Sequence, residues 1–139
     1  MMATRTAPAT REAVRLPPLV RALLADPACY DHAVGQVQLI ETHISWVLLT
    51  GEVAYKIKKP VDLGFLDFST LALRQQACAD EVRLNRRLAA EIYLGVVAIV
   101  ARDGSSDELV VERELDPDDD DEPREVIEWA VHMRRLPES

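Results

Sequence analysis

The sequence predicts an α+β fold, in which a mostly antiparallel sheet of about five or six strands is preceded by a short helix and crossed by one long helix. Two apolar β-type runs flank a tight-turn sequence at residues 50–52, and a second pair flanks residues 102–107. Between the two pairs, residues 71–90 contain neither Gly nor Pro and are rich in Ala, Leu, Gln, Arg and Glu, which predicts the longest helix.

Length and composition are those of one small domain. The 139 residues are 48% hydrophobic and 5% aromatic, so a core can form but must consist mainly of Leu, Val, Ile and Ala. The formal net charge of -8, to which residues 116–122 contribute six negative charges, predicts no nucleic-acid partner. Neither a signal peptide nor an apolar run of about 18 residues is found, so the sequence predicts a cytoplasmic protein with no membrane partner.

The first half of the chain is expected to contain one helix and three strands. Residues 1–16 are rich in Ala, Thr and Arg and are expected to form a mobile arm. Two prolines then precede an apolar stripe at residues 19–24, which predicts a short helix. Strands are expected at residues 37–40, 44–49 and 53–59, and the short turn between the last two predicts a hairpin.

The second half begins with an apolar loop. Residues 60–69 are expected to pack on another part of the fold, and Ser69 is the expected N-cap of the long helix. An acidic loop is expected at residues 116–123. Three further strands are expected from apolar β-type runs, at residues 96–101, 109–113 and 127–133.

The third strand carries two lysines on one face. With a period of two residues, Ala54, Lys56 and Lys58 point to the same side, while the apolar residues between them should meet the core. The two lysines are then about 7 Å apart on the face away from the core. The alternative interpretation is an ordinary solvated strand face.

A glutamate of the long helix is the second candidate. Glu81 has Cys78 one turn before it, and Leu84 and Leu88 follow one and two turns after it, so it sits within an apolar stripe. No Lys or Arg lies one turn away from Glu81. Burying a carboxylate without a partner is costly, so Glu81 should find a cation elsewhere, with Lys56 and Lys58 as the nearest candidates. The alternative is that Glu81 lies at the edge of the stripe and reaches water.

These residues lead to a family resemblance. A strand lysine paired with a helix glutamate contacts the nucleotide phosphates in kinases, and the sequence Val-Ala-Tyr-Lys at residues 53–56 is close to the V-A-I-K form of that strand. Over about residues 17–137, the chain resembles the start of a bacterial family of aminoglycoside-phosphotransferase-like proteins with a protein-kinase-like fold. The stretches that carry the likeness are residues 39–46, 54–60, 63–69, 81–88 and 131–137.

The resemblance implies that residues 17–139 are the nucleotide-binding small lobe of an ATP- and Mg²⁺-dependent phosphotransferase. By motif position, Lys56 is the phosphate-binding lysine, Lys58 is the alternative, and Glu81 is the helix partner. The small side chain of Ala54 leaves room for adenine, and Met133 lies at the start of the hinge beside it.

The loop before the second strand departs from the family pattern. It contains no glycine, whereas a loop that covers phosphates usually needs close backbone approach. Thr42, His43 and Ser45 are nevertheless expected to offer backbone and side-chain donors to the phosphates. The alternative for His43 is an ordinary turn residue.

No catalytic residue or metal ligand is expected within the sequence. No H-x-D loop and no Asp motif for Mg²⁺ follow Met133, so the catalytic lobe and the Mg²⁺ ligands are expected to be absent. The leading interpretation is therefore a truncated small lobe with weak ATP affinity at most and no turnover. The alternatives are a noncatalytic interaction module, which docks on a missing catalytic lobe or on itself through residues 63–68, and a gene fragment without independent function.

Overall fold

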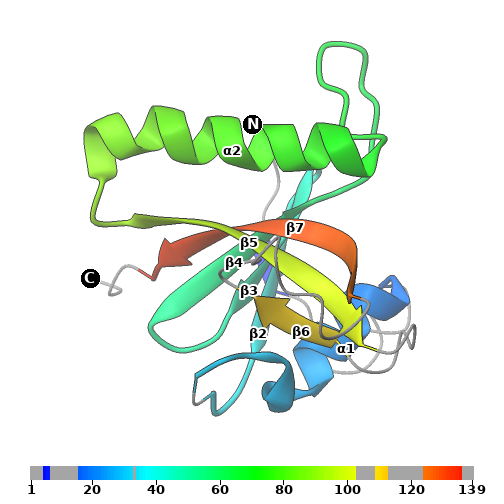
Figure 1. Ribbon diagram of the computed structural model, residues 1–139, viewed down its shortest axis with the longest axis vertical. Coiled ribbons are helices and arrows are strands. Elements are labelled where there is room, and N and C mark those ends of the chain that lie inside the picture. The colour runs from blue at the N-terminus through cyan, green and yellow to red at the C-terminus, as the bar shows by residue number, and fades with distance from the viewer. Residues whose placement is uncertain (1–4, 7–15, 33, 103–108, 113–123, 136–139) are drawn as a thin grey trace.

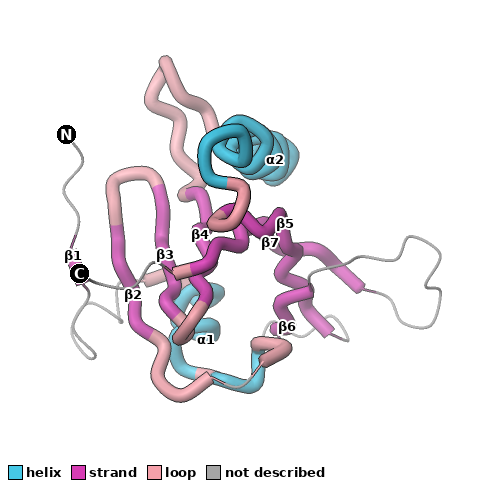
Figure 2. The backbone as a smooth tube through the Cα atoms, turned by 90° about the vertical axis from the view of Figure 1, so that its left-hand side faces the viewer, coloured by secondary structure: helices cyan, strands magenta, loops and turns pink. Residues whose placement is uncertain are grey.

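The structure is a computed structural model that describes residues 5–6, 16–32, 34–102, 109–112 and 124–135. Within these residues, one sheet of seven antiparallel strands has a helix on each face (Figures 1 and 2). The elements in chain order are β1 (Arg5–Thr6), α1 (Pro18–Ala25), the 3-10 helix η2 (Pro27–Cys29), β2 (Gln38–Glu41), β3 (Ser45–Leu49), β4 (Val53–Lys58), α2 (Leu71–Ala89), β5 (Tyr93–Arg102), β6 (Leu109–Glu112) and β7 (Arg124–Arg134).

The predicted fold class is confirmed. The strand order is β1-β2-β3-β4-β7-β5-β6, and every neighbouring pair is antiparallel. The predicted hairpin of β3 and β4 forms, and Gly51 in its turn has a φ of 103°, which a residue with a side chain rarely adopts. Both β5 and β7 are longer than predicted, since they begin before the apolar runs at residues 96–101 and 127–133.

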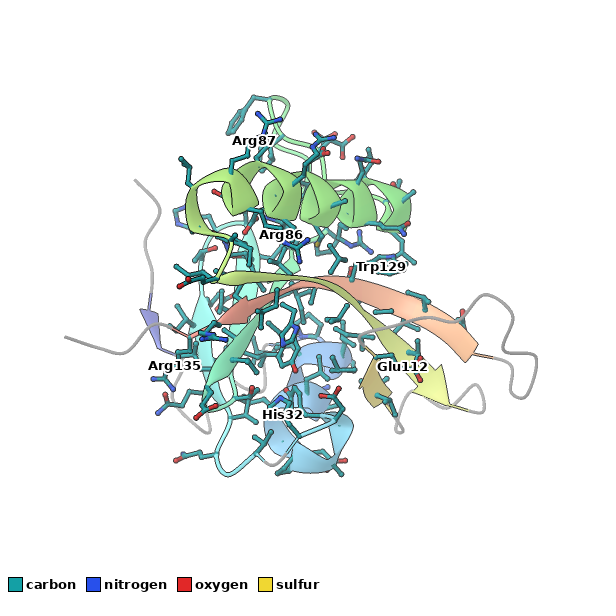
Figure 3. The ribbon with its side chains drawn as sticks, turned by 60° about the vertical axis from the view of Figure 1, so that its left-hand side comes forward. His32, Arg86, Arg87, Glu112, Trp129 and Arg135 are labelled. Atoms are coloured by element: carbon teal, nitrogen blue, oxygen red, sulfur yellow. The ribbon has the colours of Figure 1, made fainter. Side chains whose placement is uncertain are left out.

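The larger core lies between the sheet and α1. Its largest fully buried members are Leu23, Leu39, Leu48, Tyr55, Ile57 and Ile99. Tyr55 stacks on His132 of β7 with ring centroids 5.0 Å apart, and its hydroxyl lies 3.0 Å from Nε2 of His32, which Figure 3 shows on the α1 side. The apolar side chains of β4 therefore face this core, as their alternation predicts, and the lysines face α2.

Helix α2 covers the other face of the sheet over β5 and β7, whereas β2 and β3 extend beyond it (Figure 2). Its buried residues are Arg74, Cys78 and Val82, which follow one line at a spacing of four residues. The apolar stripe predicted around Glu81 is therefore wrong at its C-terminal end. Leu84 is 53% exposed and Leu88 is 91% exposed, because both are rotated away from that line at about 100° per residue.

The N-cap of α2 is Thr70 rather than the predicted Ser69. The hydroxyl of Thr70 accepts a hydrogen bond from the backbone N–H of Leu73 at 3.1 Å. Ser69 precedes the N-cap position by one residue. Its own N–H donates to the Asp67 carboxylate at 2.9 Å, which closes a turn before the helix begins.

The loop of residues 60–69 packs on the fold at its end and not along its whole length. Phe68 is buried, and its N–H donates to the carbonyl of Val61 at 2.7 Å. The prediction of a packed loop is wrong at the tip, where Phe65 is 89% exposed, because this part of the loop projects away from the sheet beside α2 (Figure 1).

Part of the predicted arm has a defined place in the fold. Residues 5–6 pair with β2 at the edge of the sheet, and Leu16 is buried in the core next to α1. The other arm residues and the predicted acidic loop at residues 116–123 lie outside the described residues. None of the helices in the described ranges has the length and apolar character that crossing a membrane requires.

Candidate functional site

Both lysines of β4 contact the same carboxylate of α2. Nζ of Lys56 lies 3.0 Å from Oε2 of Glu81, and Nζ of Lys58 donates to the other oxygen, Oε1. The two lysines share one face of β4 because they are two residues apart, and α2 crosses above that face. The prediction that Glu81 meets a strand lysine is confirmed, and it meets both.

The three side chains differ in exposure. The side chain of Lys58 is 8% exposed, that of Glu81 is 14% exposed and that of Lys56 is 29% exposed. Burial by itself raises the pKa of Glu81, but the hydrogen bond and charge of Lys58, followed by those of Lys56, outweigh burial and hold that pKa below its usual value. Glu81 is therefore ionised at neutral pH, and two lysines around one carboxylate leave one net positive charge.

A second ion pair lies next to the first. Nε of Arg74 donates to both carboxylate oxygens of Glu128, at 2.9 and 3.0 Å, and both side chains are buried between α2 and β7. Nη1 of Arg74 also donates to the carbonyl of Phe68 at 2.9 Å. Burial raises the pKa of Glu128 in spite of the opposing effect of Arg74.

Sequence reasoning missed Arg74, Glu128 and the contact of Phe68 with the site. The ring of Phe68 lies under Lys58, with Nζ 5.5 Å from the ring centroid. The position of Arg74 four residues before Cys78 was the available signal, since it places an arginine on the buried line of α2. Strict alternation puts Glu128 on the opposite face of β7, but the register of β5 and β7 shifts beside it.

The predicted neighbours of the lysines lie on the same sheet face. Ala54 of β4 is directly opposite Met133 of β7 and Leu49 of β3, and Val47 is opposite Lys56. Ala54 is buried, and the three larger side chains are partly exposed. The structure therefore brings the predicted Ala54, Lys56 and Met133 together beside an apolar face that α2 leaves partly open.

The predicted phosphate donors of the β2–β3 turn are engaged within the turn. The hydroxyl of Thr42 accepts hydrogen bonds from the backbone N–H groups of Ile44 and Ser45, at 3.3 and 3.0 Å, and lies 2.8 Å from the Ser45 hydroxyl. The N–H of Thr42 donates to the carbonyl of Ser45 at 2.9 Å. This network explains how the turn closes without glycine, and of the three predicted residues His43 is the exposed one.

Two arginines at the C-terminal end of α2 have different surroundings. Arg86 reaches back to the sheet, where Nε donates to the carbonyl of Tyr93 at 2.9 Å and Nη2 to that of Leu94, whereas Arg87 points away from it (Figure 3).

Within the described ranges, no group of three or more His, Cys, Asp or Glu side chains is placed to hold a metal ion.

The chain is similar to curated mycobacterial proteins over part of its length. It is 43% identical over 89 residues to uncharacterized protein Mb2027c of Mycobacterium bovis and, with the same figures, to uncharacterized protein Rv2004c of Mycobacterium tuberculosis. The match covers 62% of this chain and 18% of each relative, so the chain spans only a small part of the proteins that it matches. No family model and no solved structure matches the chain.

Proposed function

We propose that the chain binds ATP as the small lobe of a phosphotransferase, with the phosphates at Lys56 and the base over Ala54 and Met133. The observation that carries this proposal is the position of Lys56. Its ammonium group is held by Glu81 at 3.0 Å, yet its side chain remains 29% exposed next to an apolar sheet face. A fixed cation that borders an apolar surface suits a ligand with an anionic end and an aromatic end.

The electrostatics favour an anion but predict weak binding. The cluster of Lys56, Lys58 and Glu81 has one net positive charge, which attracts phosphate oxygens. The formal net charge of the chain is -8, so long-range steering opposes the approach of a polyphosphate. We therefore expect ATP affinity to be low and to fall further at high ionic strength.

Magnesium has no protein site in this proposal. The described residues contain no cluster of carboxylates or imidazoles that fits Mg²⁺, so we assign no step to a metal held by this chain. The residues near Lys56 bind and orient the nucleotide, and the transfer step is assigned to a separate catalytic lobe. The matched segment is 18% of the mycobacterial relatives, which leaves room for such a lobe in those proteins.

The test is a titration of the chain with ATP and with inorganic tripolyphosphate, followed by thermal unfolding and by calorimetry. Both ligands are expected to raise the unfolding temperature of the wild-type chain, because they bind the native state. Lys56→Met is expected to weaken both affinities at least about tenfold, since one charge-assisted hydrogen bond contributes about 1.5–3 kcal/mol.

Lys59→Met is the matched control. Lys59 pairs with Glu41 at 2.7 Å and lies over the ring of Trp46, on the other side of the sheet from the proposed site. This variant removes the same charge from a neighbouring lysine, so it should keep the response to ATP. Equal responses of Lys56→Met and Lys59→Met would show that the site is elsewhere.

One observation favours a second candidate, the noncatalytic interaction module. Phe65 at the loop tip is 89% exposed and Leu63 beside it is also exposed, and large apolar side chains close together on a surface are typical of protein contacts. Sedimentation velocity with and without ATP separates the two candidates. A module that associates through the loop should form larger species regardless of ATP, and Phe65→Ser should return it to the monomer.

A further inference from the structure

The two lysines that share Glu81 have different surroundings. Lys58 is 8% exposed and lies between two partners, the Oε1 atom of Glu81 and the ring of Phe68. Lys56 contacts the Oε2 atom of Glu81, and more than a quarter of its side chain is exposed. If Lys58 turned toward a ligand, its ammonium group would lose both of these contacts. Lys56 would lose one contact, and its side chain is already partly exposed.

The partners of Lys58 are themselves fixed. The N–H of Phe68 donates to the carbonyl of Val61 at 2.7 Å, and its carbonyl accepts from Nη1 of Arg74 at 2.9 Å. Arg74 is in turn held by both oxygens of Glu128. The ring beneath Lys58 therefore has a defined position that depends on α2, on β7 and on the end of the loop.

We propose that Lys58 is a positioning residue, which fixes the Glu81 carboxylate so that its second oxygen holds Lys56 toward the anion. This inference rests on the proposed function, in which Lys56 contacts the phosphates. With Lys58 on Oε1, Oε2 remains for Lys56, and the carboxylate cannot rotate without breaking an ion pair. A single lysine on Glu81 would allow either oxygen to be used and the pair to change its orientation.

The competing assignment makes Lys58 a second phosphate contact. In that case Lys58 would have to leave Glu81 and Phe68, and a carboxylate that is 14% exposed would lose its most enclosed partner. The side chain of Lys58 is enclosed by Glu81 and Phe68, while that of Lys56, which also contacts Glu81, is 29% exposed. The geometry therefore assigns one lysine to the protein and the other to the ligand.

The experiment compares Lys58→Met with Lys56→Met in the 139-residue chain, with two readouts. The first is tripolyphosphate affinity as a function of salt concentration, whose slope reports the number of protein charges that contact the anion. Lys56→Met should weaken binding at least about tenfold and reduce the slope by about one. Lys58→Met should lower affinity several-fold and leave the slope unchanged. A slope reduced by Lys58→Met would make Lys58 a ligand contact and overturn the proposal.

The second readout is the pKa of the Glu81 carboxyl, measured by carbon NMR without ligand. The hydrogen bond and charge of Lys58 lower this pKa more than those of Lys56 do, so Lys58→Met should raise it more than Lys56→Met. The reverse order would also overturn the proposal. If the wild-type chain binds neither ATP nor tripolyphosphate, the proposed function is wrong, while the order of the two pKa values still decides the positioning role.

A milder variant covers the case in which Lys58→Met does not fold. Phe68→Leu keeps all three charged groups and a buried apolar side chain but removes the ring beneath Lys58. It should raise the pKa of Glu81 and weaken tripolyphosphate binding in the same direction as Lys58→Met, by a smaller factor. An unchanged pKa and an unchanged affinity in this variant would contradict the role of Phe68 in holding Lys58.

Discussion

Replacing Arg74 by Met is expected to lower the free energy of unfolding at neutral pH by about 3–5 kcal/mol, which is typical when one partner of a buried ion pair is removed. Arg74 and Glu128 are both buried, and Arg74 also holds the carbonyl of Phe68. The variant leaves a buried carboxylate with only the Trp129 N–H as a donor among the described contacts, and it removes the arginine donor from a buried carbonyl. Urea unfolding, compared with the wild-type chain, measures the loss.

Two further variants control this prediction. Arg83→Met removes an exposed arginine of the same helix, 3.0 Å from Asp80, and should change the free energy of unfolding by less than about 1 kcal/mol. The double variant Arg74→Met/Glu128→Leu replaces the buried pair by apolar side chains and should recover most of the stability. If Arg74→Met and Arg83→Met have equal effects, the buried pair does not hold α2 to the sheet.

Glu81→Gln is expected to lower the free energy of unfolding at neutral pH by about 2–3 kcal/mol, because two lysines lose their partner and one of them is enclosed. The effect should depend on pH. Since the native structure lowers the pKa of Glu81, the glutamate adds stability above the pKa of the unfolded chain. That contribution disappears as the pH falls through the lowered pKa of the native state.

Unfolding of the wild-type chain and of Glu81→Gln from neutral to acid pH checks this sign. The difference in unfolding free energy between them should become smaller below the pKa of an ordinary glutamate.

Glu128→Gln serves as the opposite case, because burial raises the pKa of Glu128 in the native structure. Ionisation of Glu128 therefore lowers the stability of the wild-type chain as the pH rises through the raised pKa. The loss of unfolding free energy in Glu128→Gln, relative to the wild type, should therefore be largest at acid pH. Parallel pH profiles of the two variants would contradict both assignments.

The lysine–glutamate cluster was predictable because each part has a local signature. Alternation places Lys56 and Lys58 on one face of β4 within six residues of sequence. Glu81 lacks a cation one helical turn away, which is also visible without a structure. One step was long-range, namely that the carboxylate of Glu81 meets the lysines of β4. The cost of burying an unpaired carboxylate supports this step, and few other cations lie near Glu81 in sequence.

The Arg74–Glu128 pair was not predictable in this way. Its members are 54 residues apart, and a β-bulge between β5 and β7 overrides the alternation that would place Glu128 elsewhere. The exposed face of α2 was also assigned incorrectly. Leu84 and Leu88 look like core residues, but the rotation of a helix on a sheet is set by tertiary packing, and here a buried arginine takes part in that packing.

The position of β7 between β4 and β5 has a consequence for how the fold can form. Ala54 pairs with Met133, so the strand that bears the lysines acquires its second neighbour only after the chain has been synthesised through β7. Until then β4 ends a nascent sheet, with one row of backbone groups open to other chains. Pairing across such a long sequence interval is slow because a large loop must close first. We therefore expect the pairing of β4 with β7 to be a late step of folding.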